Sequence, residues 1–252
     1  MKQNDIVCPV STPNITKTHV KDAIASALLP ADIRRELCHL GLSLYFLPEC
    51  DTLPGELAFH PELQLFNLKK GVWAARKSLN KAAFPFVNNL FTFSEPSEKY
   101  PHDCIYNVFS VNNRLFCGTK TPAFISDLAA ENGMPAVRFR QNYVKCSVLI
   151  LDENSIITSD KAICEFFDSE GFNALYVTTE GIMLNGYSCG FIGGTGAMIS
   201  KKDLVLFGSI GKYKDGLKIK SFCANIGIDI CCLSNDGLYD YGGLLPLSEY
   251  LE

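Results

Sequence analysis

Four short apolar runs in the chain each follow a glycine that ends a helical pattern. They are residues 42–46 after Gly41, 136–139 after Gly133, 174–177 after Gly171 and 228–231 after Gly227. Because glycine enters the left-handed conformation without steric cost, it commonly closes a helix at this position. We therefore expect each run to be a β-strand entered from a helix. A fifth run, residues 89–93, follows a weaker helical pattern and Asn88, the next-best residue for that conformation.

The segments between these strands carry their own local signals. Apolar residues recur at helical spacing in residues 162–167, which predicts a helix with one apolar face. Thr121 directly precedes Pro122, and this pair is typical of a helix start. Polar pairs and triplets inside apolar stretches predict tight hairpin turns at residues 112–113, 152–154 and 201–203.

A cluster of polar or small residues follows each predicted strand and precedes a second apolar strand. The five clusters recur at intervals of roughly 40–50 residues, at residues 60–62, 101–103, 142–146, 186–189 and 239–243. Helix, glycine, strand, cluster and hairpin therefore recur together, and this favours internal repetition. The alternative is a generic α/β chain whose elements happen to recur.

The repetition predicts an α/β fold of five β-loop-β-(β)-α units within a single domain, residues 1–252. The approximate units are residues 20–75, 76–120, 121–160, 161–212 and 213–252. Each unit offers an apolar helix face and apolar strands, so it must cover its sheet with its own helix and abut its neighbours. We expect no unit to be stable alone.

Composition and charge narrow the class of protein and its partners. The 252 residues are 47% hydrophobic and 20% charged with a net charge of −4, and the lysines and arginines are scattered. A nucleic-acid partner is therefore not expected. The first five residues lack the apolar core of a signal peptide, and no apolar run reaches the roughly 20 residues that span a bilayer. We expect a cytoplasmic protein without a membrane partner, in which an exposed strand edge or helix face could support a homodimer.

Cysteine and histidine usage argues against disulfides and metals. The chain has eleven cysteines, an odd number, and most of them lie inside apolar runs. Small buried hydrophobes in a reducing compartment have this distribution. There is no Cys-x-x-Cys or His-x-x-x-His spacing, and there are only four histidines. We therefore expect no structural zinc site, no other metal and no cofactor.

The five repeats resemble the pentein fold, also called the guanidino-group-modifying-enzyme fold, an α/β propeller around a central channel. The resemblance runs from about Ala23 to the C-terminus. Its most specific segments resemble an uncharacterised branch found in anaerobic Firmicutes; they are residues 100–103, 143–147, 190–194 and 238–240. The resemblance implies that the loop between the first two strands of each unit points to the channel, so that the five clusters line one pocket. A fold alone implies no activity.

The resemblance also implies a chemistry, which the chain matches only in part. Familiar members of the fold attack a guanidinium carbon with a Cys thiolate, use a His as acid and base, and hold the planar cation with paired carboxylates. Glu62, Asp103 and Asp240 match the carboxylates, although each could instead cap a turn. The family nucleophile belongs to the fifth unit, where residues 241–245 contain no Cys, and the family His belongs to the fourth, where residues 186–188 contain none.

A catalytic Cys/His pair could instead lie at other positions than in the family. Cys146 could be the nucleophile and His102 the base, because Lys145 next to Cys146 could lower the pKa of the thiol. His60 could also serve as acid or base, and Cys189 lies in another predicted channel loop. The alternative is that Cys146 is an inert buried thiol at the start of a strand.

The remaining cluster residues suit the binding of a small ligand. Tyr143, Tyr187 and Tyr239, together with Asn142, would line a pocket for a cationic, amine or guanidino compound. Because the expected Cys and His are missing, we favour a binding protein over a divergent Cys-dependent hydrolase or amidinotransferase. A non-catalytic macromolecular binder is the third hypothesis. The stretch of residues 191–196 lacks the ending of a phosphate loop, so Gly193 and Gly194 are expected to permit close backbone packing near the channel or a bulge.

Overall fold

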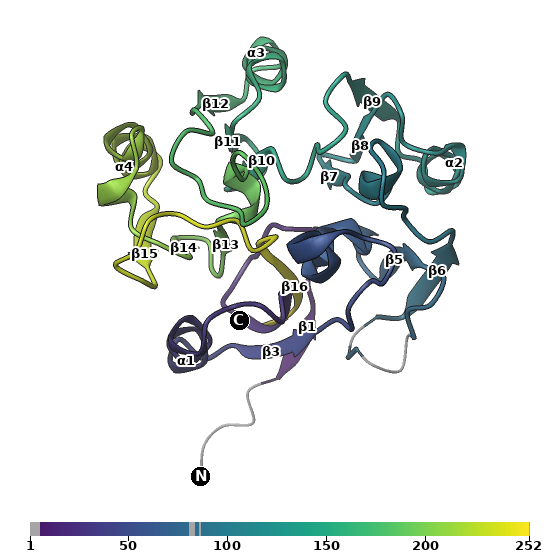
Figure 1. The fold of residues 1–252 in the computed structure, drawn as a ribbon, viewed down its shortest axis with the longest axis horizontal. Helices are drawn as coiled ribbons and strands as arrows, with labels where there is room; N and C mark the ends of the chain where they lie inside the picture. Colours follow the sequence, from purple (N-terminus) through teal and green to yellow (C-terminus); the bar gives the residue numbers. More distant parts are fainter. Residues whose placement is uncertain (1–5, 81–83, 86, 252) are drawn as a thin grey trace.

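The structure, a computed structural model, describes residues 6–80, 84–85 and 87–251 and has a mixed α/β fold. Within these residues the chain forms five small sheets around a common centre, with the helices on the outside (Figure 1). The expected α/β class is confirmed. The helix expected before residue 89 falls partly on residues 81–83 and 86, which lie outside the described residues.

Four α-helices occur in the described residues, and the glycines predicted to end them do so. The helices are α1 (Ala31–His39), α2 (Ala123–Glu131), α3 (Lys161–Ser169) and α4 (Gly216–Asn225). Two residues after each helix comes a glycine with a φ between 72° and 93°. Each helix therefore ends in the left-handed turn that only glycine adopts without strain. None of these described helices has both the length and the apolar character needed to cross a membrane.

Four of the sheets share one topology: an antiparallel hairpin followed by a third strand parallel to the second. Their strands are β4 (Leu65–Lys69), β5 (Val72–Arg76) and β6 (Asn89–Phe93); β7 (Phe109–Val111), β8 (Arg114–Gly118) and β9 (Ala136–Phe139); β10 (Val148–Ile150), β11 (Ser155–Thr158) and β12 (Asn173–Tyr176); and β13 (Gly196–Met198), β14 (Asp203–Leu206) and β15 (Asp229–Cys232). A parallel pair needs a crossover connection, and α2, α3 and α4 supply it in three of these sheets. The third strands agree with the predicted apolar runs to within one residue.

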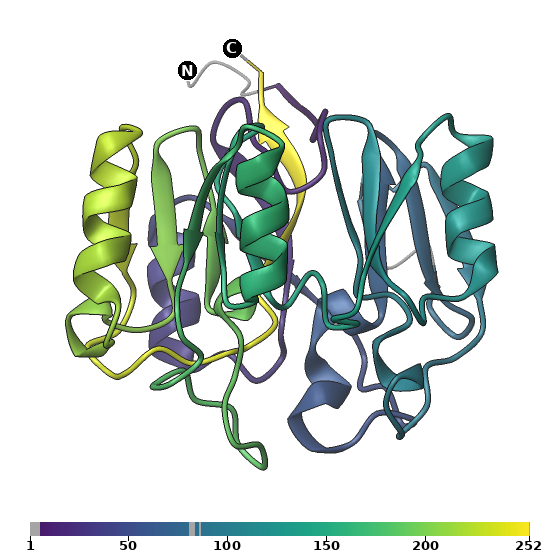
Figure 2. The ribbon, with the colours of Figure 1, turned by 90° about the horizontal axis from the view of Figure 1, so that it is seen from above.

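The first sheet is assembled from both ends of the chain. Its order is β1–β16–β2–β3, with β1 at Val7–Pro9, β16 at Leu244–Tyr250, β2 at Val20–Ala25 and β3 at Ser43–Phe46. Leu245 lies opposite Ile24 in the antiparallel pairing of β16 with β2. In Figure 2 the loops of residues 55–63 (blue) and 177–190 (green) protrude from the end opposite to the one at which β16 finishes.

Five hydrophobic clusters hold the ring together, one at each junction between neighbouring sheets. Leu65 and Trp73 of the second sheet pack with Ile24 and Leu245 of the first. The other clusters join the second sheet to the third, the third to the fourth, the fourth to the fifth, and the fifth back to the first. Each sheet therefore buries apolar side chains against two neighbouring sheets. Such small sheets need this hydrophobic packing, because a few short strands are not stable alone.

The backbone segments approach one another closely in the middle of the ring. A Cβ atom on Gly194 would lie 1.6 Å from Oδ1 of Asp240, and one on Gly193 would lie 2.4 Å from the carbonyl oxygens of Lys145 and Val148. No side chain fits at either position. The close packing expected at these glycines is confirmed, and it brings the fourth and fifth sheets together at their inner edges.

Removing a leucine side chain from the closing strand should weaken the whole ring. Leu247 of β16 is 2% exposed and belongs to the cluster between the first two sheets. We expect Leu247→Ala to lower the free energy of unfolding by about 2–5 kcal/mol, measured by urea denaturation. The matched change Leu217→Ala on α4, where the side chain is 84% exposed, should alter it by about 0.5 kcal/mol or less. Equal effects of the two changes would contradict this account of the junction.

A methyl group at Gly194 should be far more damaging than one at an open glycine. Because its Cβ would overlap Asp240, we expect Gly194→Ala to cost about 3 kcal/mol or more, seen as a lower melting temperature. Gly211 is the control, since a Cβ atom there would lie 3.4 Å from Oγ of Ser209, an ordinary contact distance. A Gly194→Ala protein as stable as Gly211→Ala would show that the close approach does not exist.

Candidate functional site

Five segments meet in the middle of the ring, each directly before the innermost strand of a hairpin or before β16. They are residues 60–64, 102–108, 142–147, 191–195 and 239–243. Four coincide with the clusters expected from the sequence. In the fourth unit the expected residues 186–189 are replaced by Phe191–Thr195, because the glycine-rich 3-10 turn at Ile192–Gly194 leads straight into β13. The loop before it projects outward instead.

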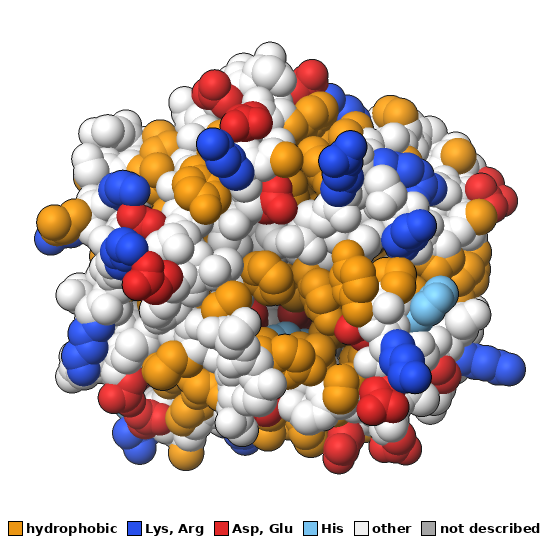
Figure 3. Space-filling model, turned by 45° about the horizontal axis from the view of Figure 1, so that its top comes forward, with side chains coloured by type: hydrophobic (Ala, Val, Ile, Leu, Met, Phe, Trp, Pro, Cys, Tyr) orange, Lys and Arg blue, Asp and Glu red, His pale blue; other side chains and the backbone are white. Residues whose placement is uncertain are grey.

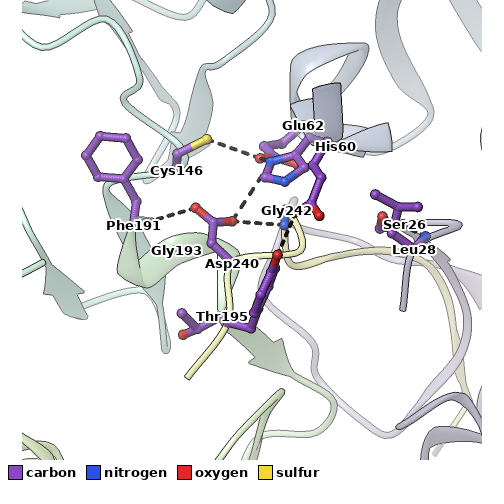
Figure 4. A network of polar contacts seen from close by, with 12 residues as sticks. Ser26, Leu28, His60, Glu62, Cys146, Phe191, Gly193, Thr195, Asp240 and Gly242 are labelled. Atoms are coloured by element: carbon purple, nitrogen blue, oxygen red, sulfur yellow. Dashed lines mark hydrogen bonds and ion pairs between the residues drawn. The ribbon is translucent and has the colours of Figure 1, made fainter. Parts of the chain in front are cut away.

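The centre of the site is a carboxylate shared by a thiol and an imidazole (Figure 4). The Cys146 thiol donates to Oε1 of Glu62 over 3.1 Å, and Nδ1 of His60 lies 3.1 Å from the same oxygen. The amide of Asn107 donates to the Cys146 sulfur over 3.0 Å and fixes its direction. His60, Glu62 and Cys146 are all buried, so these contacts are shielded from water.

Asp240 is the second carboxylate of the site. Its Oδ2 accepts from the backbone N–H of Phe191 over 2.8 Å, and its Oδ1 accepts from that of Gly242 over 3.0 Å. Oδ1 also lies 3.9 Å from Nδ1 of His60, which therefore stands between two carboxylates. The main chain holds Asp240 in place, and the positive φ of 82° at Gly242 belongs to the turn that does so.

Burial and these charges decide the protonation states. Burial lowers the pKa of His60, but Glu62, Asp240 and Glu56 outweigh it and raise that pKa to about 9, so the imidazole is protonated at neutral pH. Burial raises the pKa of the Asp240 carboxyl, and the positive charge of His60 opposes this. The imidazole of His60 is therefore charged in the resting site.

Lys145 does not activate Cys146 in the resting protein. Its side chain is buried rather than solvated, and its Nζ lies 3.5 Å from the carbonyl oxygen of Gly193. Burial lowers the pKa of the Lys145 amine. Burial also raises the pKa of the Cys146 thiol well above its usual value; Glu62 and Asp240 add to this, and Lys145 offsets only part of it. The free protein therefore holds a neutral thiol.

One oxygen of the site has no partner. Oε2 of Glu62 is buried without a hydrogen bond to any described group. It lies next to Gly242, where a Cβ atom would come within 2.3 Å. A buried carboxylate oxygen without a donor is costly, and such groups are normally satisfied by a donor, a water or an ion. This oxygen can therefore accept a hydrogen bond from a ligand N–H or from water, or contact a cation.

The same side chains are also arranged as metal ligands. One donor atom each from His60, Glu62 and Asp240 lie within 4.8 Å of one another. With the Cys146 sulfur they would offer the nitrogen, oxygen and sulfur donors that zinc accepts. No spacing in the sequence predicts this arrangement, because the three residues come from two segments almost 180 positions apart.

The pairing of Cys146 with His102 expected from the sequence is not found. His102 is exposed at the start of the 3-10 turn His102–Cys104, whereas Asp103 and Cys104 face inward and are buried. Glu62 occupies the place beside the thiol, with His60 next to it. Asn107, which the sequence analysis missed, lies directly before an inner strand as the other site residues do, and that position was the available signal.

The other predicted residues surround this centre. Tyr143 donates to Oδ2 of Asp103 and stacks against Phe191, while Oδ1 of Asp103 has no hydrogen-bond partner among the described groups. Asn142 accepts from the backbone of Lys120 over 2.9 Å and donates to Tyr100, so it supports the loop rather than facing the centre.

Tyr187, Cys189 and Tyr239 lie apart from the centre, in a side cavity of about 520 Å³. Glu56, a residue that the sequence analysis did not single out, also lines this cavity. Figure 3 shows a hollow on the loop-bearing face, with histidine and acidic side chains at its floor and mostly hydrophobic side chains around it. The structure thus divides the predicted residues between a buried centre and an open cavity beside it.

Several solved structures to which this chain is similar are described as amidinotransferases or as enzymes that act on guanidino compounds. An inosamine-phosphate amidinotransferase from Streptomyces griseus matches with a TM-score of 0.61 at 8% identity, over 95% of this chain and 97% of that one. An agmatine deiminase from C. jejuni matches with a TM-score of 0.54 at 10% identity, over 98% and 97%. DDAH from Pseudomonas aeruginosa, solved with citrulline, matches with a TM-score of 0.54 at 9% identity, over 92% and 100%.

These identities establish the fold and leave the activity open. No curated protein matches the chain. The model of a family of unknown function, DUF6873, matches residues 24–245, which is most of the chain. The chain therefore belongs to the DUF6873 family and has the fold of the pentein superfamily.

Proposed function

We propose that the axial cluster, defined as His60, Glu62, Lys145, Cys146 and Asp240, binds a small guanidinium or amidinium compound and that Cys146 attacks its central carbon. The observation that carries the proposal is the shared oxygen: Oε1 of Glu62 accepts from the thiol and lies 3.1 Å from the imidazole nitrogen. The nucleophile Cys146, the proton relay Glu62 and the acid His60 are thereby joined by consecutive buried contacts.

The charges of the cluster favour a cationic ligand. Two carboxylates face one imidazolium and one lysine amine, so the cluster is neutral only while Lys145 keeps its proton. Burial lowers the pKa of that amine, and loss of its charge leaves the cluster negative. A planar amidinium offers several N–H donors in one plane, and one of them could satisfy the unpartnered oxygen of Glu62.

The covalent step balances with the groups present. The Cys146 sulfur forms a bond to the guanidinium carbon as the thiol proton passes to Glu62. The adduct then loses one amine, which takes a proton from His60, and the proton on Glu62 restores the imidazolium. Water next attacks the thiouronium carbon. One of its protons returns to the departing sulfur and the other passes to the released amine, which leaves as an ammonium, and a urea-type product is released. If an amine attacks in place of water, the result is amidino transfer.

The ligand itself would activate the thiol. The resting thiol is neutral because burial and two carboxylates raise its pKa. A bound cation next to the sulfur opposes both effects and favours the thiolate only when there is something to attack. Binding without turnover remains the alternative function of the same site, and the two are separated by whether a covalent adduct forms.

A cationic alkylating reagent should therefore react preferentially with Cys146, whereas a neutral one should not. We expect chloroacetamidine at neutral pH to label Cys146 first, and methylguanidine to slow that labelling. Iodoacetamide should label exposed cysteines such as Cys38 and Cys231 first, because their thiols meet solvent. Peptide mass mapping identifies the sites in both reactions.

The Glu62→Gln variant and its control complete this experiment. Glu62→Gln should abolish the preference of chloroacetamidine for Cys146, whereas Glu165→Gln on the exposed face of α3 should retain it. If chloroacetamidine labels the exposed cysteines first in the wild-type protein, Cys146 is not an activated nucleophile for amidinium compounds.

The charged imidazole should appear in the pH dependence of stability. Its pKa is raised from 6.5 to about 9, so the folded protein keeps a proton that the unfolded chain releases. This stabilisation is complete below pH 6.5 and is lost as the pH rises through 9. We expect the free energy of unfolding to fall by about 2 kcal/mol between pH 6.5 and about 8.5, measured by urea denaturation.

Histidine variants test whether His60 is the group responsible. His60→Gln should remove most of the decrease over this range, and His39→Gln, whose imidazole is exposed, should leave it unchanged. A His60→Gln protein with the wild-type slope would mean that the imidazole is neutral in the folded state, and His60 could then not act as the acid.

A further inference from the structure

Three lysines from distant parts of the chain line one cavity at the end of the ring away from the protruding loops. The cavity has a volume of about 370 Å³, and Lys17, Lys70 and Lys201 contribute to its lining. The last residues of β16 line it as well, which places it at the end of the molecule where that strand finishes (Figure 2). The fold therefore gathers lysines that are scattered in the sequence.

Positive charge prevails in this cavity. Among the residues that the structure describes, none of the three lysines forms an ion pair. The one carboxylate in the described lining belongs to Glu249, which is 3% exposed. Its Oε2 accepts from the backbone N–H groups of Lys17 over 2.6 Å and of Thr18 over 3.0 Å. Because backbone donors already hold this carboxylate, the three ammonium groups remain available to an anion.

The main chain holds two of these lysines in a fixed relation to each other. Lys17 lies three residues before Val20, whose N–H donates to the carbonyl oxygen of Ile199 over 2.8 Å. Lys201 follows Ile199 in the turn between β13 and β14. Binding of an anion therefore orders the lysine side chains but requires no rearrangement of the backbone that carries them.

A larger cavity adjoins the first at two shared lysines. It has a volume of about 700 Å³, and Lys17 and Lys201 line both cavities. The rest of its lining includes the turn of residues 152–154 and the side chain of Asn173, together with apolar residues such as Ile226. Carboxylate and amide oxygens accept hydrogen bonds from hydroxyl groups, and apolar side chains pack against C–H groups. This lining suits a hydroxylated body attached to the anion.

Two hydroxyl groups in the linings give an independent indication of an oxygen-rich ligand. Oγ of Ser11 and Oγ1 of Thr16 are buried, and neither forms a hydrogen bond with a described group. Ser11 lines the smaller cavity, and Thr16, which is 4% exposed, lines the larger one. A buried hydroxyl without a partner is costly, and a ligand oxygen can accept its proton.

We propose that the two cavities together form a binding site for a small phosphorylated sugar or polyol. Its phosphate lies among Lys17, Lys70 and Lys201, which attract a dianion as point charges, and its hydroxylated body lies in the larger cavity. Both volumes are in the range of small-molecule sites. No residue of the axial cluster lines either cavity, so this site does not depend on the proposed function.

Calorimetric titration of the wild-type protein at low ionic strength tests the class of ligand. The probes are glucose 6-phosphate, inorganic phosphate and glucose. We expect glucose 6-phosphate to bind at least about tenfold more tightly than inorganic phosphate, and glucose to bind most weakly of the three. Glucose 6-phosphate that binds no more tightly than inorganic phosphate, or does not bind at all, would overturn the proposal.

Paired lysine variants place the phosphate. The double variant Lys17→Gln with Lys201→Gln should lower the affinity for both phosphate compounds about tenfold. Its control, Lys202→Gln with Lys220→Gln, removes the same charge from exposed lysines outside both linings and should lower them less than about twofold. Equal losses in two variants that melt at the wild-type temperature would mean that the anions bind through net charge alone, and the site would be rejected.

Asn154→Ala tests the position of the sugar. Asn154 is exposed and lines only the larger cavity. We expect the change to weaken glucose 6-phosphate about threefold and to leave inorganic phosphate unaltered. If the affinities for both compounds stay at their wild-type values, the hydroxylated body does not lie against this turn.

Discussion

The structure depends on a buried carboxylate that two other groups must satisfy. Glu62 lies in the middle of the ring, where water does not solvate it, and its Oε1 is held by a thiol and an imidazolium. A lone buried charge would be strongly destabilising, so the folded protein has to place both partners next to this carboxylate. His60 lies two residues before Glu62, but Cys146 is 84 residues away in the chain, and only the arrangement of the sheets around one centre brings its thiol to this carboxylate.

The ring serves this centre through two kinds of contact. Apolar clusters at the five junctions hold neighbouring sheets together, but hydrophobic contacts are not directional and do not set exact positions. The pairing of β16 with β2 links the end of the chain to its beginning. The exact placement comes from the backbone: Gly193 and Gly194 allow the fourth inner segment to lie against Lys145 and Asp240. The polar centre is therefore positioned by main-chain packing, while its protonation is set by burial.

Much of the fold followed from local patterns, but the site followed only in part. Glycines after helices and apolar runs determine the strands, whereas the inner position of Cys146, Glu62 and Asp240 was implied only by the resemblance to the pentein fold. The choice of His102 over His60 failed because spacing along a chain does not say which side chain of a 3-10 turn faces inward. Residues 186–189 were misplaced because a long loop and a short turn both precede β13, and only packing shows which one reaches the centre.

The most direct test of the central claim is a crystal structure of the Cys146→Ser protein with methylguanidine. The account predicts a planar cation next to Oε2 of Glu62 and close to Asp240, with its carbon in line with the side chain that replaces the thiol. Density for a cation elsewhere, or a metal ion held by His60, Glu62 and Asp240 while methylguanidine is excluded, would contradict it.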